Sequence, residues 1–296
     1  APARFEHVGI VTTQPSNGDI KVTDSAAGGT ALATGYKTYN GAISVDQNHQ
    51  PLKTVVEWAE EYGMATGLVA TSTISHATPA SFGAHVDSRQ KEAEISRQLA
   101  ESSIDVLFGG GSKYWNPDLF DEVRKSGGQV ISDISETVDR DRRVVGLFSS
   151  EGMPTANGGR SPSTLQMAKK AIEIIEKDPD GFFIMIEESQ VDWGGHSQSA
   201  DYIFGEMKSL NRVVNFCLDY QRSHPDVLVV LTSDHETGGC AVNDGENGEL
   251  EIQFTDDHHT ANFVPVWASG PGSQAFDAFQ DNTEIGKTLI RYIRNK

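Results

Sequence analysis

The sequence predicts an α/β fold, a three-layer sandwich in which a mostly parallel central sheet carries helices on both faces. Two observations lead to this prediction. Short apolar runs alternate along the chain with longer segments of helical periodicity, as in parallel sheets. Runs such as residues 182–186 and 227–232 are apolar at nearly every position, which is expected of strands covered on both faces. With 296 residues and no repeat or long linker, the chain fits a single catalytic domain, residues 1–296.

The first half of the chain opens with a predicted strand at 8–12. A helix of small residues follows at 22–38, and its start carries capping residues. An amphipathic helix at 52–62 leads to a strand at 66–71. The alternation continues through a helix at 92–101, a strand at 106–108 with a glycine turn at 109–111, a helix at 119–125, and strands at 130–132 and 144–148.

The second half continues the pattern. A helix at 163–177 has apolar residues at helical spacing and a serine at its start, and it leads to the strand at 182–186. A long helix at 200–221 precedes the strand at 227–232. Residues 241–258 are polar and glycine-rich, which predicts a short hairpin excursion on the surface. A strand at 263–268 and a closing helix at 284–294 complete the chain.

Composition excludes several classes of protein. A formal net charge of -18 argues against nucleic-acid binding, because phosphate backbones require clustered Lys and Arg. No apolar run approaches the roughly 20 residues needed to span a membrane. Residues 1–7 lack a basic and apolar leader, although a mature exported chain would have lost its signal peptide. The two cysteines, Cys217 and Cys240, are too few for a disulfide framework and are expected to be buried free thiols.

The stretch from Glu187 to His196 carries most of the candidate chemistry, and it directly follows a predicted strand. Ligands bind beyond the carboxyl ends of strands in open α/β sheets. Asp192 and His196 are four residues apart, so one helical turn would direct both toward the same point. A carboxylate and an imidazole suit a zinc ion that takes further ligands from elsewhere. The alternative is a capped helix start with a surface histidine.

Other strand ends offer candidate partners. Asp234 and His235 lie in a glycine-backed turn after a strand, and His259 precedes another strand; a helix cap and a chance surface pair are the alternatives. Ser25 starts the helix of small residues, where free N–H groups and the helix dipole could bind an anion. The alternative for Asp24 or Ser25 is an N-cap. Arg89, taken alone, would be a solvated surface charge.

Together these segments resemble the alkaline phosphatase family. The motifs D-S-A-A-G-G-T-A, H-A-T-P-A-S-F, E-x-x-x-x-D-W-x-x-H, S-D-H-E-T-G-G and H-T-A occur in the family's order. The likeness covers nearly the whole chain. It implies an alkaline phosphatase-like fold and the hydrolysis of phosphate monoesters, with two zinc ions and one magnesium ion per complete site.

The resemblance also assigns roles to individual residues. Ser25 matches the nucleophile that becomes phosphoserine, and Arg89 matches the guanidinium that holds two phosphate oxygens. The metal ligands implied are Asp192, His196 and His259 for the first zinc, Asp234 and His235 for the second zinc, and Glu187 and Thr78 for magnesium. Asp24, His76 and Trp193 would support these ligands from outside, and His76 with Trp193 marks a bacterial-type His/Trp variant. Glu188 stands where the family pattern has glycine.

The resemblance further implies a broad range of small phosphate monoesters as substrates, a homodimer, and a periplasmic or secreted location. A phosphodiesterase or sulfatase of the same superfamily is the alternative enzyme, although the Cys-x-Pro-x-Arg nucleophile motif of sulfatases is absent from the sequence. The alternative outside enzymes is an inactive remnant that still binds metal.

One feature of the family pattern is missing from these 296 residues. The family has an early strand that ends in Asp-Gly-Met-Gly or similar, and its aspartate bridges the second zinc and magnesium. Neither Asp19 nor Asp24 ends an apolar strand. We therefore expect an N-terminally incomplete catalytic domain. Residues 1–296 alone should bind the second zinc and magnesium weakly, which puts the activity of this exact chain in doubt.

Overall fold

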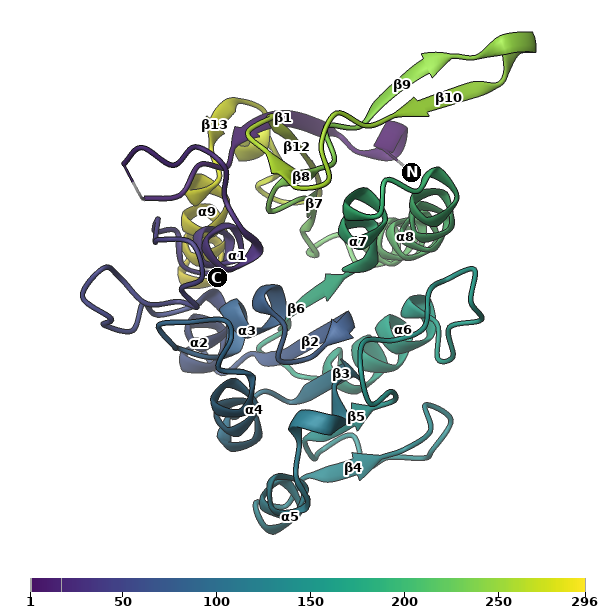
Figure 1. The fold of residues 1–296 in the computed structure, drawn as a ribbon. Coiled ribbons are helices and arrows are strands. Elements are labelled where there is room, and N and C mark those ends of the chain that lie inside the picture. Colours follow the sequence, from purple (N-terminus) through teal and green to yellow (C-terminus); the bar gives the residue numbers. More distant parts are fainter. Residues whose placement is uncertain (1, 17, 296) are drawn as a thin grey trace.

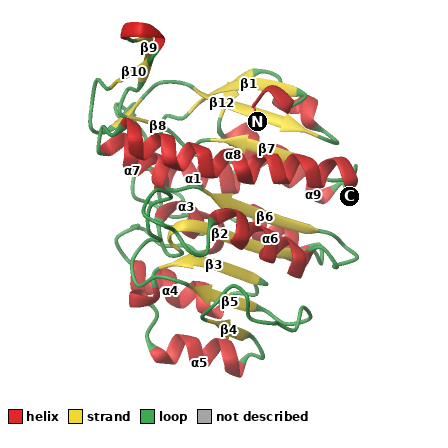
Figure 2. Ribbon diagram, turned by 90° about the vertical axis from the view of Figure 1, so that its right-hand side faces the viewer, coloured by secondary structure: helices red, strands yellow, loops and turns green. Residues whose placement is uncertain are grey.

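The computed structural model describes residues 2–16 and 18–295, and these form the predicted α/β fold (Figures 1 and 2). Its larger sheet has five strands, all parallel. Their spatial order is β4 (Gln129–Ile131), β5 (Val144–Leu147), β3 (Val106–Gly110), β2 (Ala65–Thr73) and β6 (Phe182–Glu187). All the carboxyl ends therefore point to one edge of this sheet.

Helices cover both faces of the larger sheet, because each strand sends alternate side chains to opposite sides. Leu68 and Ala70 of β2 belong to one apolar core, and Val69 belongs to the other. The Val69 core is covered by α6 (Thr164–Ile175). The opposite core contains residues of α2 (Val55–Glu61), α3 (Ala77–Gly83), α4 (Glu92–Glu101) and α5 (Pro117–Lys125). The three-layer prediction is confirmed for this part.

A second sheet of four strands completes the molecule. Its order is β13 (Phe279–Asp281), β1 (His7–Thr12), β12 (Val264–Ser269) and β7 (Val229–Thr232). Strand β12 runs antiparallel to both of its neighbours, so the parallel arrangement holds for the larger sheet and not for this one. The helices around the second sheet are α1 (Ser25–Thr34), α8 (Ala200–Ser223) and α9 (Thr283–Arg294). Val266 and Phe276 share one core with Leu32 of α1, which joins both halves.

Strand β6 is the outermost strand at one edge of the larger sheet, and β7 is the outermost strand at one edge of the second sheet. In both views β6 is the strand of the larger sheet nearest to β7 (Figures 1 and 2). Among the described residues, β6 pairs only with β2 and β7 only with β12. Every residue of β6 and β7 is half-buried, whereas β2 is buried throughout. The prediction of fully buried strands here is therefore wrong, because each strand has one unpaired edge.

Several element boundaries differ from the prediction for identifiable reasons. Helix α1 is shorter because Asp24 caps its start and Gly35, at φ 76°, ends it in the left-handed region. Helix α2 starts after Thr54, which forms a capping box with Glu57. Strand β3 runs on to Gly110, and the predicted glycine turn is made by Gly111 at φ 99°. Helix α3 and strand β13 were not predicted.

A hairpin of β9 (Ala241–Asp244) and β10 (Leu250–Gln253) projects from the body of the molecule (Figure 1). Cys217 is half-buried, but Cys240 is exposed because it lies at the base of this hairpin, so the expectation of two buried thiols is wrong for Cys240. The remaining short elements are the turns of 3-10 helix Pro2–Arg4, Ser112–Tyr114, Glu246–Gly248 and Ser273–Phe276. Within the described chain, no helix combines the length and apolar character needed to cross a membrane.

Candidate metal centre and nucleophile

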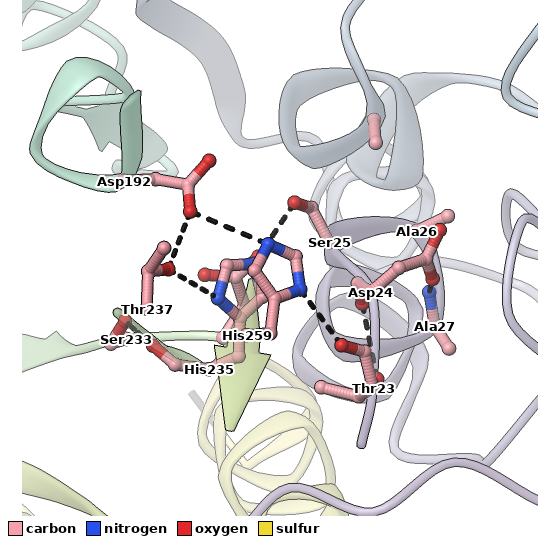
Figure 3. A network of polar contacts seen from close by, with 12 residues as sticks. Thr23, Asp24, Ser25, Ala26, Ala27, Asp192, Ser233, His235, Thr237 and His259 are labelled. Carbon is pink, nitrogen blue, oxygen red and sulfur yellow. Dashed lines mark hydrogen bonds and ion pairs between the residues drawn. The ribbon is translucent and has the colours of Figure 1, made fainter. Parts of the chain in front are cut away.

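Separate segments bring together Ser25, Asp192, His235 and His259 beside the start of α1 (Figure 3). Glu187 ends β6, and helix α7 (Gln190–His196) follows after two residues. Asp234 and His235 lie between β7 and the short strand β8 (Glu236–Thr237). Strand β8 pairs with β11 (His259–Thr260), so that His259 lies opposite Thr237. This pairing brings two motifs that are distant in sequence side by side.

Asp192, His196 and His259 form one ligand group. Their side chains offer one atom each, and these atoms lie within 4.8 Å of one another. Nε2 of His196 and Nε2 of His259 are each 3.4 Å from Asp192 Oδ1. The other ring nitrogens face backbone carbonyls, with His196 Nδ1 2.6 Å from Asp257 O and His259 Nδ1 2.9 Å from Thr23 O. A proton on Nδ1 leaves each Nε2 lone pair free for a metal.

Asp234 and His235 form a second group next to the first. Asp234 Oδ2 is 3.2 Å from His235 Nε2, and the same nitrogen is 3.0 Å from Ser25 Oγ. The rings of His235 and His259 stack with their centroids 3.5 Å apart, so the two groups adjoin. The second group therefore contacts the serine, as the resemblance implies for the second zinc.

The start of α1 presents Ser25 toward these groups. Asp24 is the N-cap, and its carboxylate accepts a hydrogen bond of 3.0 Å from the Ala27 N–H. The capping role therefore belongs to Asp24, which leaves the Ser25 hydroxyl available. Gly28 allows the helix to approach closely, because a Cβ at this position would lie 2.9 Å from Asp234 O.

Arg89 is held beside Ser25's helix by two partners. Its Nη1 donates to Asp24 Oδ2 at 3.1 Å, and its Nη2 is 3.3 Å from His76 Nε2. Burial and the neighbouring Arg89 charge lower the pKa of His76 to about 4, so its neutral ring can accept this hydrogen bond. The edge of the His76 ring meets Trp193, with centroids 6.2 Å apart. Asp24 and His76 thus hold the guanidinium, Trp193 packs against His76, and Arg89 is not a solvated surface charge.

Glu187 and Thr78 supply a third, oxygen-rich group. The Glu187 carboxylate accepts a hydrogen bond of 2.6 Å from the Ser189 hydroxyl, and the Thr78 hydroxyl is also its partner. Ser72 Oγ lies 3.4 Å from the same carboxylate. Carboxylate and hydroxyl oxygens suit a hard ion such as Mg²⁺.

The electrostatics show why this site suits cations. Burial, with smaller contributions from Asp234 and Asp192, raises the pKa of Glu187 to about 7, although its side-chain hydrogen bonds act against this shift. Burial also raises the pKa of Asp234 to about 7, with Asp192 as the next cause. Burial and the nearby His259 lower the pKa of His235 to about 3. The site thus brings carboxylates and neutral imidazoles together without enough positive charge to balance them. Zinc and magnesium ions would supply that charge and take these groups as ligands.

Two residues of the site were not identified from sequence. Thr237 Oγ1 donates to Asp192 Oδ1 and lies 3.3 Å from His235 Nδ1, so it links the two ligand groups. Ser189 Oγ accepts from the Ser72 N–H at 3.0 Å and donates to Glu187. Thr237 lies inside the S-D-H-E-T-G-G motif, which was the signal available; Ser189 carried no such signal.

The chain is similar to known alkaline phosphatases. A family model described as alkaline phosphatase matches residues 1–248. Alkaline phosphatase 3 of Bacillus subtilis is 37% identical over 309 aligned residues, which cover 100% of this chain and 65% of that protein. The chain therefore spans less than two thirds of the length of this relative.

Solved structures agree with this similarity. The alkaline phosphatase of the Antarctic bacterium TAB5 superposes with a TM-score of 0.90 at 35% identity, covering 99% of this chain and 90% of that one. A variant of the TAB5 enzyme, with a histidine replaced by aspartate, has Mg bound in a site named M3; it gives a TM-score of 0.89 at 35% identity, covering 99% of this chain and 89% of that one.

We predict that Thr237→Val weakens zinc binding by about 10- to 100-fold, because it removes the hydroxyl that orients Asp192 and His235. Thr237→Ser keeps the hydroxyl and should bind zinc with nearly wild-type affinity. Competition with a chromogenic chelator measures both affinities. Equal affinities for the two variants would show that the hydroxyl has no positioning role.

We also predict that Glu187 and Asp234 lower the stability of the metal-free protein as the pH rises from about 4 to about 7, whereas the lowered pKa values of His76 and His235 act in the opposite direction. Glu187 and Asp234 have raised pKa values, so over this range the folded state holds protons that the unfolded state has released. With a chelator present, the Tm of the Glu187→Gln/Asp234→Asn variant should therefore rise relative to the Tm of the wild type over this range, at roughly 2–4 °C per kcal/mol of difference. A Tm difference between the variant and the wild type that does not change with pH would contradict the assignment.

Proposed function

The chain belongs to the alkaline phosphatase family, and we propose that it hydrolyses phosphate monoesters to an alcohol and inorganic phosphate through a phosphoserine on Ser25. One observation carries this proposal. The buried Ser25 hydroxyl lies at the start of α1, 3.0 Å from His235 Nε2, and beside the metal-type side chains. A serine nucleophile, an anion-binding helix start and cation-binding groups thus share one site.

Each half of the reaction uses Ser25. In the first half its oxygen attacks the phosphorus atom, the bond from phosphorus to the ester oxygen breaks, and the alcohol leaves with a proton. In the second half, water attacks the phosphorus atom, the bond to Ser25 breaks, and the hydroxyl is restored. His235 Nε2 lies 3.0 Å from the Ser25 hydroxyl, so an ion held by His235 would lie next to the nucleophile.

Arg89 binds the phosphate group in this proposal. Asp24 and His76 hold one part of its guanidinium, and the remaining N–H groups can donate to two phosphate oxygens in the paired geometry that lysine cannot supply. The free N–H groups at the start of α1 add to the anion site. Little of the alcohol portion has to be recognised, which supports a broad range of small monoesters.

The metal ions of the proposal are two zinc and one magnesium. Asp192, His196 and His259 would hold the first zinc, Asp234 and His235 the second, and Glu187 with Thr78 the magnesium. When bound, these ions would supply the positive charge that favours an ionised nucleophile and a departing alkoxide. Mg in the M3 site of the TAB5 variant supports magnesium binding in the family.

The presence of His76 and Trp193 supports the proposal that the chain is a bacterial-type His/Trp variant of the family. His76 fixes Arg89, and Trp193 packs so closely over Gly152 that a Cβ there would lie 2.6 Å from the indole. Through these contacts both residues would adjust the phosphate and magnesium groups without binding either. We also propose, from the family resemblance, a homodimer that works in the periplasm or outside the cell.

A further strand between β6 and β7 would complete the sheet. The unpaired edges and the half-buried apolar residues of both strands support pairing with a segment outside residues 1–296. Both strands lead into the site, at Glu187 and Asp234. Such a strand could add the bridging aspartate of the family pattern, and residues 1–296 alone would bind the second zinc and magnesium weakly.

We predict that Ser25→Ala lowers kcat for 4-nitrophenyl phosphate by at least about 10³-fold, because the nucleophile is lost. The wild-type protein should prefer this monoester to bis(4-nitrophenyl) phosphate. Zinc content, measured by mass spectrometry of metals, should be equal in variant and wild type and serves as the control for folding. A preference for the diester would favour a phosphodiesterase, and bound zinc without turnover in the wild type would indicate an inactive metal-binding protein.

A further inference from the structure

Glu188, in the junction between β6 and α7, belongs to a buried charge network. Its carboxylate pairs with Arg160, and Arg160 Nη2 also pairs with Glu206 Oε2 at 2.6 Å. The three side chains are at most 2% exposed. Thr164 Oγ1 donates to Glu188 Oε1 at 3.0 Å, which adds the start of α6 to the network.

This network fixes three separate parts of the chain. Arg160 lies in the loop before α6 and also donates through Nε to Pro154 O at 2.8 Å. Glu206 lies on α8, and its Oε1 accepts from the Ala156 N–H at 2.7 Å. Glu188 lies in the two-residue junction between β6 and α7. One guanidinium thus joins the loop before α6, helix α8 and the junction.

Glu188 lies between a proposed metal ligand and a residue that holds this ligand in place. Glu187 precedes it, and Ser189, which donates to Glu187, follows it. Gln190 extends the same anchoring, since its amide donates to Thr71 O and to Met153 O of the loop before α6. A shift of the Glu188 backbone would therefore move the Glu187 carboxylate and the start of α7.

We propose that Arg160, Glu188 and Glu206 are positioning residues that set Glu187 for binding a divalent cation, Mg²⁺ by the chemistry of its oxygen ligands. The inference rests on the proposed function, because Glu187 is a magnesium ligand only within that proposal. Burial of a charged network is costly unless geometry is well defined, so such a network specifies one arrangement of the backbone. Glu188 replaces the glycine of the family pattern with a residue that anchors the junction.

The choice of variant follows from the charges. Arg160→Ala would leave two buried carboxylates without a cation and could unfold the protein. Glu188→Ala instead leaves a single ion pair between Arg160 and Glu206, so the protein is expected to fold. Glu188→Gln keeps an acceptor oxygen for Arg160 and Thr164 and serves as the conservative variant.

Isothermal titration of Mg²⁺ into the zinc-loaded, full-length protein tests the proposal. Glu188→Ala should lower Mg²⁺ affinity by about 10-fold or more and lower kcat at limiting Mg²⁺, with KM for 4-nitrophenyl phosphate nearly unchanged. Glu188→Gln should recover most of the affinity. Wild-type Mg²⁺ affinity in a folded Glu188→Ala protein would overturn the proposal, and so would equal losses in both variants.

Arg143→Ala provides a control, because Arg143 is a half-buried guanidinium that donates to the backbone carbonyls of Leu99, Ala100 and Ile104. It lies next to the start of β5, away from the carboxyl ends of the strands. The control should lose thermal stability and keep its Mg²⁺ affinity; a loss of affinity here would attribute the effect to general destabilisation and overturn the proposal. If the wild type bound no Mg²⁺ in this titration, the proposed function itself would fail.

Discussion

The crowding of acidic side chains at one point is the constraint on which the site depends. Asp192, Asp234 and Glu187 interact electrostatically, and burial raises the pKa values of Asp234 and Glu187 to about 7. Arg89 already pairs with Asp24, so it cannot neutralise all three. Burying unpaired carboxylates is unfavourable, and bound divalent ions remove that cost. These side chains therefore fit a metal centre and would be destabilising in an apolar core.

The scaffold produces this crowding through strand ends and one short strand pair. Glu187 lies at the end of β6, and Asp234 follows β7. The pairing of β8 with β11 places His259 close to Asp234. Helix α1 then approaches closely enough for Ser25 to contact His235, and Gly28 makes that approach possible. Backbone carbonyls fix the tautomers of His196 and His259, so their free nitrogens face Asp192. Both histidines are thus oriented by backbone groups that bind no metal in the proposal.

Sequence patterns predicted the larger sheet and its covering helices except α3, because alternating apolar runs reflect burial directly. They could not predict that β12 runs antiparallel or that β6 and β7 are half-buried, since both depend on which strands pair. The ligand groups were available from motifs and resemblance, and the structure brings Asp192, His196 and His259 together. Thr237, Ser189 and the partners of Glu188 depend on contacts between distant segments, which spacing alone does not encode.

The most direct test of the account is the position of zinc in crystals of the metal-loaded protein, located by anomalous scattering at the zinc edge. The account predicts one peak bonded to Asp192, His196 and His259 and a second bonded to Asp234 and His235, each about 2.0–2.2 Å from its ligand atoms. The exposed cluster of Asp256, Asp257 and His258 also has ligand atoms within 4.8 Å of one another. Zinc at that cluster, with none beside Ser25, would contradict the account.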